Sequence, residues 1–259
     1  MNRFRFLYNY LKHFITAWNT GGFGVHSPFV YQFTRYVLYE KHYFYVFSSI
    51  EEIRKKLKKD NRLLDIKDFG TGTDRKELVK DTVSRSVKSA KYGQLLFRMV
   101  HYFKSILILE LGTSLGLTTS YLAASSSKIK CVSIEGSSEI AGIAQENFNN
   151  LGLTNIRLKV GNINEILISE LDKMERLDMI FIDANHKSNA VLSYFETCLP
   201  KVHKDTVLVI DDIYWSKDME SAWTEIKNHP KVTATIDLFQ LGIVFFNTDL
   251  HTKHYKMRY

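Results

Sequence analysis

Residues 109–119 have the sequence LELGTSLGLTT, in which Gly112 and Gly116 follow a nearly all-apolar run. The segment that comes after the second glycine has helical character. A ligand-binding turn of this kind needs a strand that delivers the chain, glycines that let the backbone approach the ligand, and a helix that starts directly afterwards. The sequence therefore predicts a strand, a ligand-binding turn and a helix around these residues.

From about residue 90 onward, apolar β-rich segments alternate with segments of helical period, which is typical of a parallel α/β sheet. The five predicted strands are at 105–111, 129–135, 156–160, 177–183 and 206–211. A predicted helix around 218–229 ends at Pro230, and two further apolar runs, 232–239 and 242–247, follow it. Only two residues separate these runs, too few for a parallel crossover, so they should form an antiparallel hairpin at one edge of the sheet.

A second glycine-rich segment, DFGTGT at Asp68–Thr73, competes for the role of the ligand-binding turn. The run before it is short and charged, and no second strand with a terminal acid follows it. We therefore interpret Asp68–Thr73 as a loop, and whether it lines the site stays open.

The glycine spacing distinguishes between cofactors. A dinucleotide fold has G-x-G-x-x-G, so that a pyrophosphate can rest on the helix N-terminus. Here the pattern is E-x-G-x-x-x-G, and the acid, Glu110, would repel phosphates and suit a cationic ligand. S-adenosylmethionine (SAM) is such a ligand: Glu135, at the end of the next strand, can accept hydrogen bonds from its ribose, and its adenine would lie near Gly161 and Asn162.

These motifs, in this order, make residues 91–259 resemble a class I SAM-dependent methyltransferase. The resemblance implies a Rossmann-like, seven-stranded, doubly wound α/β sheet with an antiparallel last strand. It also implies a domain division into a helical, basic, aromatic-rich extension, residues 1–90, and a methyltransferase domain, residues 91–259. The predicted cofactor-binding residues are Glu110, Leu111, Gly112, Thr113, Ser114, Gly116, Glu135, Gly136, Gly161, Asn162 and Asp183.

The ends of the fourth and fifth predicted strands, FIDANH and IDDIYW, carry the candidate acceptor chemistry. With the glycine turn they resemble the cation-dependent O-methyltransferases of the catechol, caffeoyl-coenzyme A and macrocin types. Three carboxylates at adjacent strand ends suit a hard divalent ion such as Mg²⁺, so Asp183, Asp211 and Asp212 are the predicted metal ligands. His186 and Asp183 are the predicted catalytic residues, with His186 as the base. The catechol-like group usually has Asn in place of Asp212 and Lys in place of His186.

Taken as a whole, the chain also resembles a set of class I methyltransferases from Bacteroidetes, a resemblance that brings no substrate with it. In related O-methyltransferases the segment before the first strand covers the methionine moiety. Ser89, Tyr92 and Gly93 are therefore candidate lid residues.

Three functions stay open: O-methylation of a small metabolite or sugar, methylation of a hydroxylated tRNA nucleotide, and a non-catalytic cofactor-binding scaffold. The net charge of +7 is concentrated in residues 1–109, which have 20 Lys/Arg against 9 Asp/Glu and could hold RNA phosphates. The intact turn and the carboxylates favour an enzyme, and no RNA-binding module is recognisable. A small-molecule acceptor is the first expectation.

The N-terminal segment is unusually aromatic, with 16 of the 34 Phe, Tyr and Trp residues in positions 1–50. We expect helices at about 3–18 and 27–47, and residues 1–47 are a candidate for peripheral membrane contact. His26 is a further candidate site residue. Cys131 and Cys198 suggest neither a disulfide framework nor a zinc site. Without a signal peptide or a transmembrane run, a cytoplasmic protein is expected, and a homo-oligomer stays open.

Overall fold

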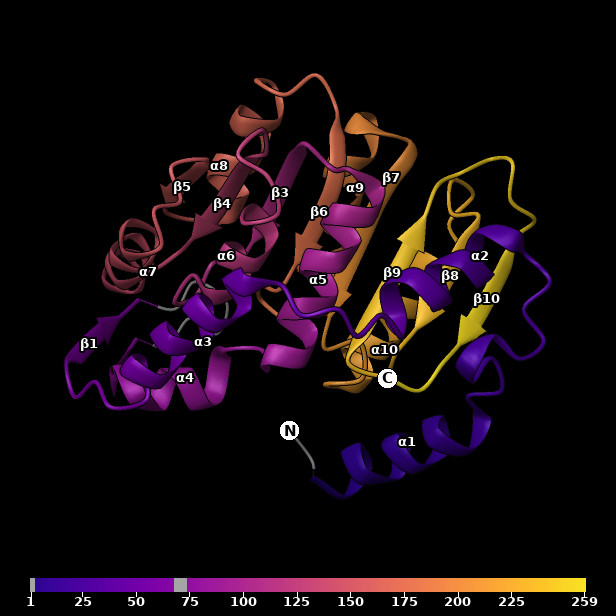
Figure 1. Cartoon of the computed structure of the whole chain (residues 1–259), viewed down its shortest axis with the longest axis horizontal. Coiled ribbons are helices and arrows are strands. Elements are labelled where there is room, and N and C mark those ends of the chain that lie inside the picture. Colours follow the sequence, from indigo (N-terminus) through magenta and orange to yellow (C-terminus); the bar gives the residue numbers. More distant parts are fainter. Residues whose placement is uncertain (1–2, 68–73) are drawn as a thin grey trace. The chain divides into compact units, whose positions relative to one another are not determined.

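The computed structural model describes residues 3–67 and 74–259 and divides the chain into two compact units. The first unit consists of residues 1–40 and 175–259, and the second of residues 41–174. Figure 1 shows the elements of both units, which are described one at a time below. The expected domain division at residue 90 stays a prediction. Residues 41–90 belong to the second unit together with the glycine turn.

The sheet of the second unit has three parallel strands, β3 (Leu107–Leu111), β4 (Lys130–Glu135) and β5 (Ile156–Val160), in this order. The connecting helices are α6 (Leu117–Ala123) and α7 (Ser138–Asn150), and α8 (Ile163–Leu171) follows β5. Helix α5 (Ala90–Phe103) precedes β3. Because parallel strands of one sheet end at the same edge, the residues after β3, β4 and β5 share that edge.

Residues 41–90 complete the core of the second unit. They form α3 (Tyr45–Leu57), an antiparallel hairpin of β1 (Leu63–Ile66) and β2 (Arg75–Leu78), and α4 (Val79–Ser86). Buried residues of these elements, among them Phe47 and Ile50, belong to one apolar cluster with Leu115, Leu117 and Tyr121 of the turn and helix α6. The segment before β3 therefore packs against the helix that follows the glycine turn.

The strands of the first unit have the order β10-β8-β9-β7-β6. Strands β6 (Leu177–Ile182) and β7 (Val202–Asp211) are parallel, and β9 (Leu241–Phe245) is antiparallel to both β7 and β8 (Ala234–Asp237). The predicted hairpin is confirmed, but it is not at the edge, because β10 (Lys253–Lys256) pairs outside β8. Helices α9 (Ser188–Cys198) and α10 (Lys217–Lys227) connect these strands, with a short 3₁₀ turn at Leu199–Lys201.

The N-terminal elements of the first unit are α1 (Arg3–Thr16), the 3₁₀ turn η1 (Thr20–Gly22), α2 (Pro28–Phe33) and the π-helical turn η2 (Thr34–Leu38). The second helix expected here, 27–47, is interrupted: it ends at Leu38, and α3 begins at Tyr45. Ser27 caps α2 by accepting a hydrogen bond from the Val30 amide, with Pro28 in the first turn.

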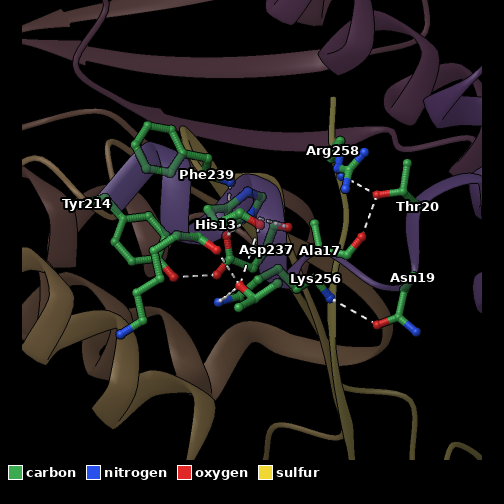
Figure 2. A network of polar contacts seen from close by, with 11 residues as sticks. His13, Ala17, Asn19, Thr20, Tyr214, Asp237, Phe239, Lys256 and Arg258 are labelled. Carbon is green, nitrogen blue, oxygen red and sulfur yellow. Dashed lines mark hydrogen bonds and ion pairs between the residues drawn. The ribbon is translucent and has the colours of Figure 1, made fainter. Parts of the chain in front are cut away.

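A buried polar network fixes α1 to strand β8 (Figure 2). The His13 Nε2 atom lies 3.0 Å from Asp237 Oδ1, and both side chains are at most 5% exposed. The Tyr214 hydroxyl donates to Asp237 Oδ2 at 2.6 Å, and the Phe239 amide donates to Oδ1 at 2.9 Å. Burial alone would raise the pKa of Asp237, but these partners outweigh it and lower that pKa.

The predicted α/β class with a Rossmann-like, mostly parallel sheet is confirmed. Seven strands were expected in the Rossmann-like part. The described residues contain eight, β3 to β10, and the additional strand is β10. Both cysteines are buried and free. No helix in the described ranges is long and apolar enough to span a membrane.

Candidate active site

The turn after β3 has a backbone that glycine makes accessible. Gly112 has φ 97° and Gly116 has φ 77°, both in the left-handed region, and Ser114 between them has φ 49°. The Gly112 amide donates to the Ile134 carbonyl of β4 at 3.0 Å, which ties the start of the turn to the neighbouring strand. The predicted strand, turn and helix are all present here.

Glu135, at the carboxyl end of β4, holds this turn in place. Its Oε2 atom accepts a hydrogen bond from the Ser114 amide at 2.8 Å, and Oε1 accepts one from the Ser137 amide at 3.0 Å. The Gly161 amide, directly after β5, donates to the Glu135 carbonyl at 2.8 Å. Three predicted cofactor-binding segments are therefore brought together at one sheet edge. Glu135 is partly exposed, and a carboxylate oxygen accepts more than one hydrogen bond.

Gly116 allows close packing of the turn on helix α7. A Cβ atom at this position would lie 2.6 Å from the Phe148 ring and 3.0 Å from the Ala144 Cβ. The Asn147 side chain, from the same helix, donates to the Leu115 carbonyl at 2.8 Å. The second glycine of the motif is therefore required by packing as well as by its backbone conformation.

Glu110 is the acid of the glycine motif, and its charge was expected to attract a cationic cofactor. Its side chain is fully buried, and its Oε2 accepts hydrogen bonds from the hydroxyls of Thr119 and, at 2.6 Å, Ser133. Thr113, also buried, lies 2.5 Å from Ser133, hydroxyl to hydroxyl. Burial raises the pKa of Glu110 to about 8, although both hydroxyls act to lower it. The acid therefore connects β3, β4 and α6 beneath the turn and is largely protonated at neutral pH.

The other predicted cofactor residues differ in exposure. Leu111 is buried at the end of β3, whereas Gly136 is partly exposed directly after Glu135. Gly161 has φ 138°, and Asn162 caps α8 by accepting a hydrogen bond from the Asn164 amide at 3.1 Å. Gly161 and Asn162 are also partly exposed, so that their atoms can contact a ligand at this edge.

Two hydroxyls next to the turn support the fit of a polar ligand here. The side-chain oxygens of Ser114 and Ser137 are buried and have no hydrogen-bond partner among the described residues. A buried polar atom without a partner is costly, so such atoms usually mark a place that a ligand or water completes. Both serines also contribute the amides that bind Glu135.

In the first unit, Asp183 and His186 lie in the loop that follows β6. The His186 Nε2 atom is 3.7 Å from Asp183 Oδ1, and the His186 side chain is one-third exposed. Asn185 and His186 both have left-handed backbones, with φ 68° and 40°. Strained non-glycine backbones of this kind often occur at functional sites. The structure therefore brings the two predicted catalytic residues together.

Asp211 and Asp212 do not join Asp183 in a metal site. Asp211 is the last residue of β7 and is only 1% exposed, while Asp212 follows with φ 52° and donates its amide to the Gln240 carbonyl at 2.7 Å. Within residues 3–67 and 74–259, no group of three or more His, Cys, Asp or Glu side chains is arranged to hold a metal ion. This arrangement therefore does not fit the predicted metal ligands.

The loop after β7 contributes two residues that the sequence analysis did not identify. The Trp215 ring lies 6.0 Å from the His186 ring, centroid to centroid. Tyr214 anchors the same loop to Asp237 (Figure 2). The motif IDDIYW contains both aromatic residues, but nothing in its spacing shows which of them is buried and which faces the histidine.

The remaining candidates have structural positions. Gly93 lies in α5, where a Cβ atom would be 2.4 Å from the Tyr121 ring, and Tyr92 beside it is buried. Ser89 is at the N-terminus of that helix, and its side chain makes no capping hydrogen bond. His26 is exposed before α2. The role of these residues in a lid stays a prediction, and Asp68–Thr73 lies outside the described residues.

Part of this chain is similar to a known protein family. Residues 109–213, from the end of β3 to just after β7, match a family described as a methyltransferase domain. The predicted resemblance to class I SAM-dependent methyltransferases is thereby confirmed. None of the curated proteins matches this chain.

Solved structures show the fold of the methyltransferase domain. An O-methyltransferase from Bacillus cereus, in complex with SAH, is 22% identical, covers 83% of this chain and 96% of its own, and has a TM-score of 0.57. The O-methyltransferase TomG from Streptomyces achromogenes, involved in tomaymycin synthesis and in complex with SAM, is 17% identical, with coverages of 83% and 95% and a TM-score of 0.59. The SAH-bound methyltransferase PaMTH1 from Podospora anserina is 14% identical, with coverages of 80% and 99% and a TM-score of 0.56.

Proposed function

We propose that this chain is a SAM-dependent O-methyltransferase that acts on a hydroxyl group of a small metabolite or sugar. The observation that carries the proposal is the pre-formed turn, which the Ser114 amide and the Glu135 carboxylate hold at the carboxyl edge of the sheet. Two of the similar structures are described as O-methyltransferases, one with SAM and one with SAH. These relatives support oxygen as the methyl acceptor.

The residues of the second unit would hold the cofactor. When bound, SAM supplies a methyl group on a positively charged sulfur. Glu135 would accept hydrogen bonds from the ribose hydroxyls, Gly112 and Gly116 would allow the backbone to approach the methionine moiety, and Gly161 and Asn162 would contact the adenine. The Ser114 and Ser137 hydroxyls would find their partner in the cofactor or in a water molecule. Glu110 acts beneath the turn by keeping β3, β4 and α6 in register.

The residues of the first unit would prepare the acceptor. His186 takes the proton of the acceptor hydroxyl on its Nδ1 atom, since its Nε2 atom faces Asp183 at 3.7 Å. The Asp183 carboxylate then stabilises the imidazolium that forms, and the acceptor is left with a nucleophilic oxygen. The Trp215 ring lies beside the imidazole, with the ring centroids 6.0 Å apart. The divalent cation stays outside this proposal because the three aspartates are not gathered to bind it.

Calorimetry of the full chain tests the cofactor half of the proposal. Glu135→Ala should weaken SAM binding by about 1.5 to 3 kcal/mol, the scale for losing hydrogen bonds to a charged group. The matched control is Glu175→Ala, which removes an exposed acid in the first unit and should leave the affinity unchanged. Equal affinities of the two variants would remove Glu135 from the site.

Methyl transfer tests the acceptor half. The chain, supplied with labelled SAM, should methylate members of a panel of small hydroxylated compounds, and His186→Gln should lower kcat by a factor of about 10² to 10⁴ while SAM affinity stays the same. Activity should persist after exhaustive chelation. If the label enters only a tRNA pool, the methyl acceptor is RNA and the proposed small-molecule acceptor is wrong. SAM binding without any transfer would favour the scaffold.

A further inference from the structure

Helix α1 is apolar on two opposite faces. One face packs on the sheet of the first unit: the rings of Phe6 and Tyr10 contact Phe239 at 5.1 and 5.2 Å, and His13 pairs with Asp237. The other face carries large apolar side chains that are exposed to solvent. We call this second face the outer stripe; it consists of Phe4, Leu7, Tyr8, Leu11 and Ile15, with Trp18 just after the helix.

The outer stripe is continuous along the helix. Its members follow one another at intervals of three or four residues, apart from the adjacent Leu7 and Tyr8, and those within the helix lie in an arc of about 100°. Phe4 is 89% exposed, Ile15 68% and Trp18 72%, values that are far from those of core residues. A contiguous exposed apolar surface of this kind usually marks an interaction site.

The inner face of α1 keeps the outer stripe turned outward. The His13–Asp237 pair is buried, and the C-terminal segment binds the end of α1 (Figure 2). The Lys256 amide donates to Asn19 Oδ1 at 3.3 Å, and the Arg258 amide donates to Thr20 Oγ1 at 2.9 Å. Because these contacts fix the rotation of α1, the stripe cannot turn inward without breaking the buried contact between His13 and Asp237.

The chain segment that contains α1 and the C-terminal segment that binds it are both basic. Residues 1–39 contain four Lys or Arg and no Asp or Glu. Residues 250–259, which bind the segment at the end of α1, contain three further Lys or Arg residues and also no Asp or Glu. Arg5 is paired with Glu220 of α10, whereas Lys12, beside the stripe, is exposed. An apolar stripe with Trp, Tyr and Phe on a helix that has no acidic residue of its own and adjoins basic segments is typical of a helix that lies in the surface of an anionic membrane.

We propose that α1 docks this chain on an anionic lipid surface, with the outer stripe inserted among the acyl chains and the basic residues at the headgroups. The helix has 14 residues, about 21 Å, which is shorter than the hydrocarbon core, so it lies along the surface. A second copy is the weaker candidate, because a two-fold contact would place two helices that carry basic but no acidic residues against each other. RNA is also weaker, because Leu7, Leu11 and Ile15 offer nothing to phosphates.

Flotation of the full chain with vesicles tests the docking. The protein should float with phosphatidylglycerol vesicles, bind phosphatidylcholine vesicles at least tenfold more weakly, and lose binding as salt rises. Ile15→Gln should weaken binding by roughly fivefold to tenfold because it removes an inserted aliphatic side chain. The matched control is Ile168→Gln, the same change at an isoleucine of α8 that is 60% exposed, and it should bind like the unchanged chain.

Charge is tested in the same assay. Lys12→Glu should reduce binding to phosphatidylglycerol severalfold, whereas Lys55→Glu, in the basic run of α3, should not. Circular dichroism confirms that each variant is folded, which is expected because all four side chains are exposed. Equal binding of Ile15→Gln and Ile168→Gln would overturn the proposal. The proposal would also be overturned if the unchanged chain does not float but forms a dimer, and Ile15→Gln dissociates that dimer. These results do not depend on methyl transfer.

Discussion

The turn after β3 and the loop after β6 both place non-glycine residues in the left-handed backbone region: Ser114 in the turn, and Asn185 and His186 in the loop. The turn is enclosed by partners, since Glu135 accepts the Ser114 amide and helix α7 packs on Gly116. His186 in the loop is one-third exposed, and its contact with Asp183 is an ion-pair distance of 3.7 Å. In the proposed site, the cofactor side is therefore held by more hydrogen bonds and tighter packing than His186 on the acceptor side.

The largest stability effect should come from Gly116→Ala. The new methyl group would lie 2.6 Å from the Phe148 ring, and the alanine backbone would have to adopt a φ of 77°. Overpacking and the left-handed backbone together should lower the free energy of unfolding by about 3 kcal/mol. Urea unfolding of the two chains measures this difference.

Gly142→Ala is the matched control on helix α7. Its Cβ would meet nothing within 4 Å, so the substitution should stabilise the chain by about 0.5 to 1 kcal/mol. On the acceptor side, His186→Gln should change the free energy of unfolding by no more than about 0.5 kcal/mol, as for other surface positions. A cost for His186→Gln as large as that for Gly116→Ala would break the contrast between the two regions.

Periodicity and spacing were sufficient to predict the strands and the glycine turn, because apolar segments and glycines act locally. They did not predict β10, since KHYK is short and polar and becomes a strand only by pairing with β8. They also did not show the break between Leu38 and Tyr45, because aromatic residues continue through it, at Tyr39, Tyr43 and Phe44.

For the candidate site, the sequence did not show the directions in which the side chains point. Glu110 was expected to face the cofactor, but the alternation of side chains along β3 turns it toward Ser133 in the core. Asp211 and Asp212 are adjacent in sequence, and the left-handed backbone of Asp212 separates their directions. Such directions depend on packing between elements, which spacing along the chain does not record.

The pH dependence of stability tests whether Glu110 is a buried support of the turn. Its pKa is raised from 4.5 to about 8 in the folded chain, so between these values the unfolded chain releases a proton that the folded chain keeps. Its contribution is therefore fully present below pH 4.5 and is lost as pH rises toward 8, with a slope that approaches about 1.4 kcal/mol per pH unit.

Glu110→Gln removes this titration and keeps an oxygen that can accept from Thr119 and Ser133. Urea unfolding of both chains at several pH values should show that the free energy of unfolding of the variant increases relative to that of the unchanged chain as pH rises. A difference that is independent of pH would mean that Glu110 is ionised in the folded chain and open to solvent or ligand.

The smallest effect should come from Ser114→Ala, and its sign should differ between two measurements. The Ser114 hydroxyl is buried without a partner among the described residues, so its removal should stabilise the free chain by about 0.5 to 1 kcal/mol. If the cofactor satisfies this hydroxyl, the same change should weaken SAM binding by about 1 kcal/mol, because the Ser114 amide still binds Glu135 and only one hydrogen bond is lost.

Ser105→Ala is the matched control for the expected gain in stability and loss of SAM affinity. Its hydroxyl is also buried without a partner in the described part of the chain, but Ser105 lies before β3, at the end of the strand away from the turn. This variant should gain stability in urea unfolding while its SAM affinity, measured by calorimetry, stays unchanged. If both serine variants gain stability and neither loses affinity, the Ser114 hydroxyl is a packing defect, and the cofactor would be held by the backbone of the turn and by Glu135.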